Sequence, residues 1–567
     1  MQIKGIGASK GVALAKVLKI EEKEIKVSEK SSRSIEDEIK LFNEAIKNVE
    51  EKIKKGKQMA KDPEHAEIFE AHLNFLNDPF TTERIIDMIN QGYSSIYSVS
   101  KVYEENEQIF LSMDDEYMRE RAADIRDIKS KLLYSLSGIT EHDLSSISEE
   151  VVIVANDLTP SQTVQLNKEF VKGFVTNIGG PTSHTAIMAR SLGIPSVVGT
   201  NNILEQVQDG DWIAINGEKG YVIINPNSTE KVEIAKQQKL YQEYLLKLKL
   251  FRGKESVTKD GHKVELAANI GSPNDLQSII DNDAEAVGLF RSEFLYMDNV
   301  DWPSEDEQFE AYKKVVSGMN GKRVVIRTLD IGGDKTLKYF KFPEEMNPFL
   351  GYRAIRFCLQ NEKIFKTQLR ALIRASYYGK VAIMIPMITN VKEFLDAKKI
   401  FEETYYELSE ETSEIAPLSE IEFGLMMETP AAAILSDKFC KYADFVSIGT
   451  NDLIQYSMAA DRMNESISYL YQPLNPSIIR LIKHVIDGAH KNGKWAGMCG
   501  EMAGDRRALP ILVGLGLDEF SMSASNILNT REMLSNLSLQ KCKEIANKVL
   551  EMDTDEEVQE FLNKELK

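Results

Sequence analysis

The chain has 567 residues, too many for a single hydrophobic core, so we expect about three domains. Its apolar fraction of 43% and charged fraction of 28% are ordinary for a soluble globular protein. The formal net charge of −19 argues against broad binding to nucleic acid or to anionic membranes, whose phosphates such a surface would repel, and it suits a basic protein partner.

The cysteines and the first residues of the chain indicate the compartment. The four cysteines have no CxxC spacing, which argues against structural zinc and against a disulfide framework: Cys358, Cys440, Cys499 and Cys542. The first residues lack the apolar region of a signal peptide, and no run of 18 apolar residues occurs. We therefore predict a cytoplasmic protein that is neither secreted nor inserted in a membrane.

The N-terminal part alternates between two kinds of pattern. One or two strands are expected within 4–20, where a Gly-rich segment precedes Val and Leu. Apolar residues at helical spacing then predict helices at 36–57, 63–77, 82–90, 97–110 and 114–136. Short strand patterns return at 151–154, 174–175, 197–198, 212–215 and 221–224. These patterns predict one α/β domain, residues 1–20 and 145–227, interrupted by an all-helical subdomain, residues 21–144.

A loop and the helix that follows it carry a candidate nucleophile. Residues 171–176 form a β-branched run, a Gly-Gly turn follows, and Thr182 or Ser183 is expected to cap a helix. His184 then lies in the first helical turn, where free N–H groups and the helix dipole favour an anion and disfavour the imidazolium. A neutral imidazole beside an anion site is a nucleophile for phosphorus. The alternative is that His184 only caps or packs.

A polar segment separates this region from the rest of the chain. Residues 229–252 are rich in Lys and Gln with a weak apolar stripe, which predicts a connecting helix within a linker of residues 228–256. A coiled-coil dimer helix is the alternative, although the heptads are irregular.

The last 300 or so residues alternate between apolar strand patterns and helix-length segments. The expected strands are 264–270, 286–291, 323–329, 381–387, 421–427, 445–448, 495–498 and 520–522. Eight such strands in a segment of this size predict a (β/α)₈ TIM barrel over residues 257–567.

Polar or reactive side chains follow the predicted barrel strands. They are Arg291, Glu293, Arg327, Asp330, Glu428, Asn451, Asp452, Cys499 and Glu501. The carboxyl ends of barrel strands converge on one face, where active sites are built. Arg291 and Arg327, with Arg462, would present fork-shaped donors suited to a phosphate and a carboxylate.

Two further features of this face have a functional and a structural interpretation. Glu428 and Asp452 end adjacent predicted strands and could share Mg²⁺, although two isolated acids are as easily loop residues. Cys499 follows an apolar run, where a lone cysteine is usually a small core residue.

Several segments resemble known proteins. GGPTSHTAIMARSLGIPSVVG, residues 179–199, is similar to the phosphohistidine signature of phosphoenolpyruvate-utilising phosphotransferases, in which this His receives a phosphoryl group. GLFRSEFLYM, RTLDIGGDK, NPFLGYRAIR, GLMMETPAA, SIGTNDLIQY, AADR and GMCGEMAGD resemble, in the same order, the phosphoenolpyruvate-binding barrel of the Enzyme I family of the bacterial sugar phosphotransferase system. The resemblance covers nearly the whole chain.

The resemblance implies an activity and a set of site residues. The enzyme would phosphorylate itself on His184 from phosphoenolpyruvate, release pyruvate, and pass the phosphoryl group to a His of the phosphocarrier HPr. Glu428 and Asp452 would hold Mg²⁺, and Cys499 would protonate the enolate carbon of the leaving pyruvate. The resemblance also implies a homodimer formed through the barrel. The residues implied to bind or line the phosphoenolpyruvate site are Arg291, Arg327, Asn451, Asp452, Arg462, Lys335 and Arg353.

The same resemblance makes the helical subdomain the docking platform for HPr. One helix would present a stripe at i, i+4, i+7 and i+8, flanked by the acids Glu64, Glu67 and Glu70: Ile68, His72, Phe75 and Leu76. Acidic flanks suit a basic partner. The stripe could equally pack the helical bundle itself.

Two other classes of protein stay open. An ATP- or pyrophosphate-linked enzyme would carry a large nucleotide-binding region before His184, but no Gly-rich nucleotide loop is visible there. A regulatory paralogue would use the same chemistry on another acceptor. This chain also has Pro181 where many Enzyme I sequences have Arg, which leaves the helix N-terminus to steady the phosphoryl group.

Overall fold

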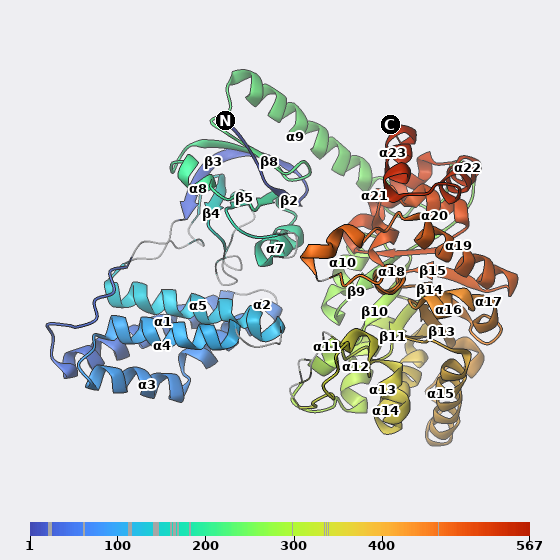
Figure 1. Ribbon diagram of the computed structural model, residues 1–567, viewed down its shortest axis with the longest axis horizontal. Helices are drawn as coiled ribbons and strands as arrows, with labels where there is room; N and C mark the ends of the chain where they lie inside the picture. The colour runs from blue at the N-terminus through green and yellow to red at the C-terminus, as the bar shows by residue number, and fades with distance from the viewer. Residues whose placement is uncertain are drawn as a thin grey trace. The chain divides into compact units, whose positions relative to one another are not determined.

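The computed structural model describes residues 1–20, 25–59, 63–111, 116–139, 144, 147–158, 162, 166, 169–180, 183–297, 299–333, 335, 337, 339–462 and 464–566. The chain divides into two compact units, Met1–Leu245 and Leu246–Lys567 (Figure 1). In the part of the chain that the structure describes, no helix combines the length and the apolar character needed to cross a membrane.

The first unit contains an eight-stranded sheet in the order β1-β8-β7-β3-β4-β5-β6-β2. Its strands are β1 (Gln2–Lys4), β2 (Ile6–Ser9), β3 (Val12–Ile20), β4 (Val151–Ala155), β5 (Val171–Thr176), β6 (Ser196–Val198), β7 (Trp212–Asn216) and β8 (Tyr221–Ile224). β3 and β4 pair in parallel although the helical segment separates them in sequence. The fold is therefore the predicted α/β domain with an inserted helical segment, but three strands, not one or two, precede the insertion.

The inserted helices are α1 (Ile35–Met59), α2 (Pro63–Leu76), α3 (Pro79–Asn90), α4 (Ser95–Leu111) and α5 (Glu116–Ser137) (Figure 1). Their apolar faces form one core, which includes Phe42, Ile53, Ile89 and Ile128. Local signals define the ends: Asp78 caps α3 by accepting from the Thr81 N–H, and a proline occupies the first turn, where its missing N–H costs nothing.

The predicted docking stripe on α2 lies largely inside this core. His72 is 0% exposed and Leu76 is 2% exposed, while Phe75 is half-buried and packs edge-to-face on Phe110 at 5.8 Å. The His72 ring contacts two carboxylates of α5, with Nε2 3.0 Å from Asp124 Oδ1 and Nδ1 3.7 Å from Asp127 Oδ2. Burial contradicts a docking contact for His72 and Leu76, because helical spacing locates an apolar face without saying what covers it.

The docking prediction for α2 also named Ile68 and an acidic flank. The side chains of Ile68, Glu64 and Glu67 lie outside those that the structure describes. Glu70 is exposed, so an acidic group does lie on the outer side of α2, where it forms an ion pair with Lys57.

The second unit is a closed barrel of eight parallel strands, which confirms the predicted TIM barrel. The strands are β9 (Glu265–Ile270), β10 (Ala286–Arg291), β11 (Val324–Arg327), β12 (Val381–Ile385), β13 (Glu422–Met427), β14 (Phe445–Ile448), β15 (Trp495–Met498) and β16 (Glu519–Met522). Their bounds nearly match the predicted ones, because each strand is a buried apolar run and such runs are continuous in parallel sheets.

Helices cover the outside of the barrel. They are α10 (Leu276–Asp281), α11 (Phe294–Met297), α12 (Glu305–Gly318), α13 (Ile355–Gln360), α14 (Glu362–Ala375), α15 (Val391–Glu411), α16 (Pro430–Ile434), α17 (Ser436–Phe439), α18 (Thr450–Met458), α19 (Pro476–Lys491), α20 (Leu509–Leu515), α21 (Ile527–Asn536), α22 (Leu539–Leu550) and α23 (Asp555–Glu565). The first unit adds α7 (His184–Leu192) and α8 (Ile203–Gln206), and α9 (Ser228–Lys249) crosses the division between the units.

The barrel interior is organised in rows. Leu289, Val325, Met384, Met426 and Cys499 belong to one buried cluster inside the strands. Because side chains alternate along a strand, the row through Val325 continues to Arg327, and the row through Met426 continues to Glu428. The polar residues at the carboxyl ends of the strands therefore stand on a packed apolar floor.

If His72 serves the bundle core, His72→Ala should lower the free energy of unfolding by about 1–3 kcal/mol, because the change opens a cavity and removes a partner of Asp124. Urea unfolding followed by circular dichroism measures the effect. Asn74→Ala, at an exposed position of the same helix, is the control. Equal stability of the two variants would contradict the structural role.

Candidate active site

The His184 segment begins a helix as predicted. Ser183 is the N-cap of α7, with φ −61° and ψ 153°, and its Oγ accepts from the Ala186 N–H at 3.4 Å. His184 is the first helical residue, beside N–H groups that no helical carbonyl can reach. Pro181, Thr182 and the His184 side chain lie outside what the structure describes. The backbone thus supplies the anion-favouring helix end on which the nucleophile interpretation depends.

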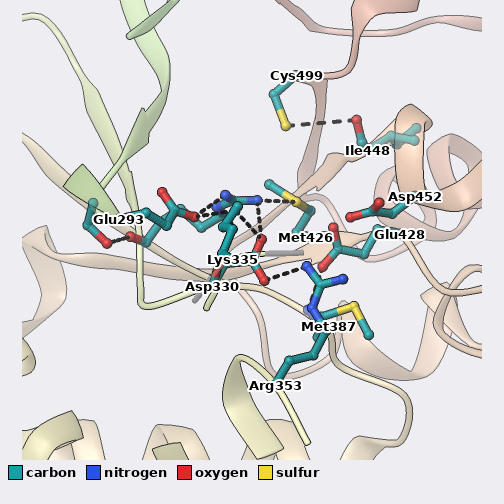
Figure 2. Close-up of polar contacts among 12 residues, drawn as sticks. Glu293, Asp330, Lys335, Arg353, Met387, Met426, Glu428, Ile448, Asp452 and Cys499 are labelled. Atoms are coloured by element: carbon teal, nitrogen blue, oxygen red, sulfur yellow. Dashed lines mark hydrogen bonds and ion pairs between the residues drawn. The ribbon is translucent and has the colours of Figure 1, made fainter. Parts of the chain in front are cut away.

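The second candidate region is a charge network at the carboxyl ends of the barrel strands (Figure 2). Arg327, at the end of β11, is 6% exposed and lies between two acids. Its Nη2 pairs with Glu293 Oε1, and its Nη1 lies 2.8 Å from Asp330 Oδ2. Burial would raise the pKa of Glu293, but Arg327 and Lys335 lower it below its ordinary value. Arg327 is therefore held charged and in one orientation.

Asp330 is the centre of that network. Arg353 Nη2 donates to Asp330 Oδ1 at 2.8 Å, and Lys335 Nζ donates to the Asp330 carbonyl at 3.0 Å. Burial opposes ionisation of this carboxyl, yet Arg327, Lys335 and Arg353 hold its pKa well below the ordinary value. Arg353 also donates to the hydroxyl of Tyr456 at 3.4 Å, and that hydroxyl donates to the Phe349 carbonyl at 2.6 Å. The Asp330 carboxylate thus orients Arg327 and Arg353, and the carbonyl of the same residue holds Lys335.

A second layer of hydrogen bonds supports the backbone of this network. Ser292 Oγ donates to the Arg327 carbonyl at 2.8 Å, and Gln368 Nε2 donates to Ser292 Oγ at 3.0 Å. The same Gln368 accepts from the Leu329 N–H at 2.8 Å. The strand end that carries Arg327 is therefore fixed from behind.

Glu428 and Asp452 form a pair of acids on the same face, and Figure 2 shows them turned toward each other. Glu428 is 1% exposed, and burial followed by the charges of Asp452 and Asp330 raises its pKa to about 8. Its Oε1 accepts from the backbone N–H of Met387, a residue at φ 59° in the left-handed region that non-glycine residues rarely adopt. The pair is short of positive charge, which is the condition that a bound cation relieves.

Cys499 follows β15 and is 4% exposed. Its Sγ lies 3.9 Å from the Ile448 carbonyl. Burial raises the pKa of the thiol to about 11, against the lowering effect of Arg327. The thiol therefore stays protonated at neutral pH, as the predicted proton donor requires.

Most of the predicted barrel residues meet at this face. Figure 2 shows Asp330, Arg353, Glu428, Asp452 and Cys499 in one region of this face. The remaining predicted residues lie around them as follows: Arg291 pairs with Arg327 in strand register and is exposed, Asn451 accepts from Tyr471 at 3.3 Å, and Arg462 Nη1 lies 3.9 Å from Asp452. No group of three or more His, Cys, Asp or Glu side chains in the described ranges is placed to hold a metal ion.

Sequence reasoning missed some of the supporting residues. Asp330 was noted only as a polar strand-end residue, although its position three residues after Arg327 could have suggested an ion pair. Tyr456 lies four residues after Asp452 on α18, a spacing that places both on one helix face. Nothing in the sequence points to Met387, because it contributes a backbone N–H in an unusual backbone conformation and not a side chain.

Comparison with known proteins fits this geometry. Three family models match: the N-terminal domain of PEP-utilising enzymes at residues 4–121, their mobile domain at 147–220 and their PEP-binding domain at 247–539. The barrel and its charged face thus define a PEP-utilising enzyme.

Curated relatives narrow the class further. Phosphoenolpyruvate-protein phosphotransferase of Staphylococcus carnosus is 51% identical over 98% of this chain and 98% of its own length. The proteins of the same name from Mycoplasma capricolum and Listeria innocua are 50% and 52% identical, each over 99% of both chains. The chain belongs to the phosphoenolpyruvate-protein phosphotransferase family.

If Asp330 is the centre of the network, Asp330→Asn should cost about 3–5 kcal/mol of stability, because it leaves buried arginines without their countercharge. Urea unfolding of the barrel measures this loss. The control, Asp396→Asn, removes an ion pair with Lys392. The Asp396 side chain is 45% exposed and that of Lys392 is 81% exposed, so the change should cost at most about 1 kcal/mol of stability. Similar losses in the two variants would contradict the assigned role of Asp330.

Proposed function

We propose that this protein transfers the phosphoryl group of phosphoenolpyruvate to His184 and then to a His of the phosphocarrier HPr, releasing pyruvate. The observation that carries the proposal is the juxtaposition, at one end of the barrel, of a fixed arginine, two facing carboxylates and a protonated thiol. Family membership supports the same activity, since the relatives are named phosphoenolpyruvate-protein phosphotransferases.

Phosphoenolpyruvate carries a phosphate and a carboxylate, and both need cationic partners. Arg327 is preoriented by Glu293 and Asp330, while Arg291 is exposed and Arg462 is partly exposed at the same face. These guanidinium groups can bind the two anionic ends of the substrate by paired hydrogen bonds. The other residues proposed to line the substrate are Asn451, Asp452, Lys335 and Arg353.

Glu428 and Asp452 fit a magnesium ion. Both offer carboxylate oxygens, and burial followed by the charges of Asp452 and Asp330 raises the pKa of Glu428, an effect that a cation between the two acids would offset. Mg²⁺ typically takes one or two carboxylates and leaves its other positions to water and substrate oxygens. When bound, the ion would neutralise charge on the phosphoryl and enolate oxygens during transfer.

The chemistry needs one bond exchange and one proton. A ring nitrogen of His184 attacks phosphorus in line as the bond from phosphorus to the enol oxygen breaks, and that electron pair stays on enolpyruvate. The Cys499 thiol then gives its proton to the methylene carbon, which completes pyruvate, and the thiolate regains a proton from solvent. Because His184 and the barrel belong to different units, the His184 segment must approach the barrel for transfer.

The partners follow from the same proposal. The acceptor HPr is proposed to dock on the helical segment, although not through His72 or Leu76. A homodimer through the barrel is proposed as well, and sedimentation of the full chain tests it. A cytoplasmic location would keep the four free cysteines reduced.

His184→Ala should abolish the phosphoenzyme and leave phosphoenolpyruvate binding near normal, because the substrate-binding groups lie in the other unit. Labelled phosphoenolpyruvate with Mg²⁺, followed by acid and alkali treatment, detects an acid-labile, alkali-stable phosphohistidine. His484→Ala, at an exposed position, is the control. Acid-labile, alkali-stable label that persists in His184→Ala would contradict the assignment.

Glu428→Gln and Asp452→Asn should each slow transfer from phosphoenolpyruvate on the order of 100-fold and weaken its Mg²⁺ dependence. Transfer back from phospho-HPr to His184 should continue, because that step uses only the first unit. The two rates are compared by rapid quench on folded variants. If transfer from phospho-HPr to His184 slowed equally, that step would also depend on the barrel, which would contradict the proposal.

Cys499→Ala should keep Mg²⁺ and phosphoenolpyruvate binding but turn over about 100-fold or more slowly. In deuterated buffer with stereospecifically labelled phosphoenolpyruvate, the deuteron should reach the methylene carbon from both faces, so the pyruvate methyl group should lose its preferred configuration. Cys440→Ala, a buried cysteine on another part of the barrel, is the control. A fully active variant that keeps the facial preference would make Cys499 a packing residue.

A further inference from the structure

A cavity opens at the opposite end of the barrel from the charged face. It measures about 860 Å³, within the usual size of small-molecule sites. Its lining includes Glu265 and Glu422, the first residues of β9 and β13, and Arg323, which directly precedes β11. These positions are amino-terminal strand ends, whereas Glu428 and Cys499 follow the carboxyl ends. The cavity is therefore separate from the proposed catalytic site.

The inner wall of this cavity is a charged layer of the barrel. Alternate strands contribute the four side chains of one interior layer, usually bulky apolar ones. Here β9, β11, β13 and β15 supply Glu265, Arg323, Glu422 and Trp495. Arg323 lies over the Trp495 ring at 3.9 Å, and the Trp495 indole donates to Glu422 at 3.0 Å. A layer that would normally seal the barrel instead presents polar groups to the cavity.

The inner wall carries more negative than positive charge. Arg323 Nη2 forms ion pairs with both Glu265 and Glu519, and it lies 2.8 Å from Glu519 Oε2. Burial and the neighbouring Glu519 raise the pKa of Glu265 to about 8. Glu519 is 1% exposed, and in the part of the chain that the structure describes its Oε1 has no hydrogen-bond partner. Glu265 and Glu519 thus share one guanidinium, Glu422 is bonded to the adjacent Trp495, and a hydrogen-bonding cation would balance the excess negative charge.

The mouth of the cavity has the opposite character. Lys322 and Lys380 line it and are exposed, and Lys322 Nζ donates to the Ala284 carbonyl at 2.7 Å. They precede adjacent strands, β11 and β12, and the Val324 N–H donates to the Lys380 carbonyl at 2.9 Å between those strands. Of the acids that line the cavity, Glu420 is exposed, while Glu285 is occupied by the Leu266 N–H at 2.7 Å. The two lysines can hold an anionic group.

We propose that this cavity binds a small zwitterionic molecule, with a primary ammonium beside Glu265 and Glu422 and a carboxylate or phosphate on Lys322 and Lys380. The ammonium would add hydrogen-bond donors and positive charge beside these two carboxylates. Between the two charged zones, Ile415, Ala416 and Pro417 offer an apolar wall for a short carbon chain. The proposal concerns occupancy of this cavity and does not depend on the phosphoryl transfer proposed above.

Isothermal titration of the full chain with 6-aminohexanoate tests the proposal, with hexylamine and hexanoate as probes that carry only one of the two charges. We expect saturable binding of 6-aminohexanoate, at least about tenfold tighter than either single-charge probe. Saturating phosphoenolpyruvate should leave this binding unchanged, because it occupies the other end of the barrel. Absence of saturable binding, equal binding of hexylamine, or competition by phosphoenolpyruvate would overturn the proposal.

Variants locate the binding. Combined Lys322→Gln and Lys380→Gln changes, both at exposed positions, should weaken binding of 6-aminohexanoate by about tenfold without unfolding the barrel. Lys543→Gln, an exposed lysine on α22, is the matched control and should bind normally. Equal affinity of the double variant and the control would place the binding elsewhere and overturn the proposal.

Discussion

The buried ion pairs around Asp330 are the constraint on which the charged barrel face depends. Arg327 and Arg353 are almost without solvent contact, so each needs a countercharge within the protein. Asp330 supplies it to both, and the strength of these pairs keeps Asp330 ionised despite complete burial. The result is a guanidinium surface that is already oriented before a substrate arrives, so little reorganisation is needed during phosphoryl transfer.

The same face also contains two like charges close together, those of Glu428 and Asp452. Glu428, which lies near Asp452, accepts from the backbone N–H of Met387, a residue in the left-handed conformation. Both the strain and the carboxylate repulsion cost stability in the absence of a cation. A cavity lined by Glu265 and Glu422 lies at the other end of the barrel. Uncompensated charge is thus concentrated where the structure has room for a ligand.

The barrel strands could be predicted from the sequence, but most of the ion pairs and hydrogen bonds between their loops could not. Each strand is a continuous apolar run followed by polar residues, so strands such as Ala286–Arg291 and the site residues after them could be located from the sequence. The pairing of Asp330 with Arg353 could not, because it joins two loops that only the closed barrel brings together. The burial of His72 could not be predicted for a similar reason. Its carboxylate partners come from α5, and Asp124 lies 52 residues further along the chain.

Reconstitution of the whole transfer tests the central claim most directly. The protein is mixed with labelled phosphoenolpyruvate and Mg²⁺, freed of unreacted substrate, and then given HPr alone. The account predicts one labelled phosphoryl group on His184 of each chain, located by mass spectrometry, and its movement to HPr without ATP or inorganic phosphate. Label on another residue, or a phosphoenzyme that requires a nucleotide to form, would contradict it.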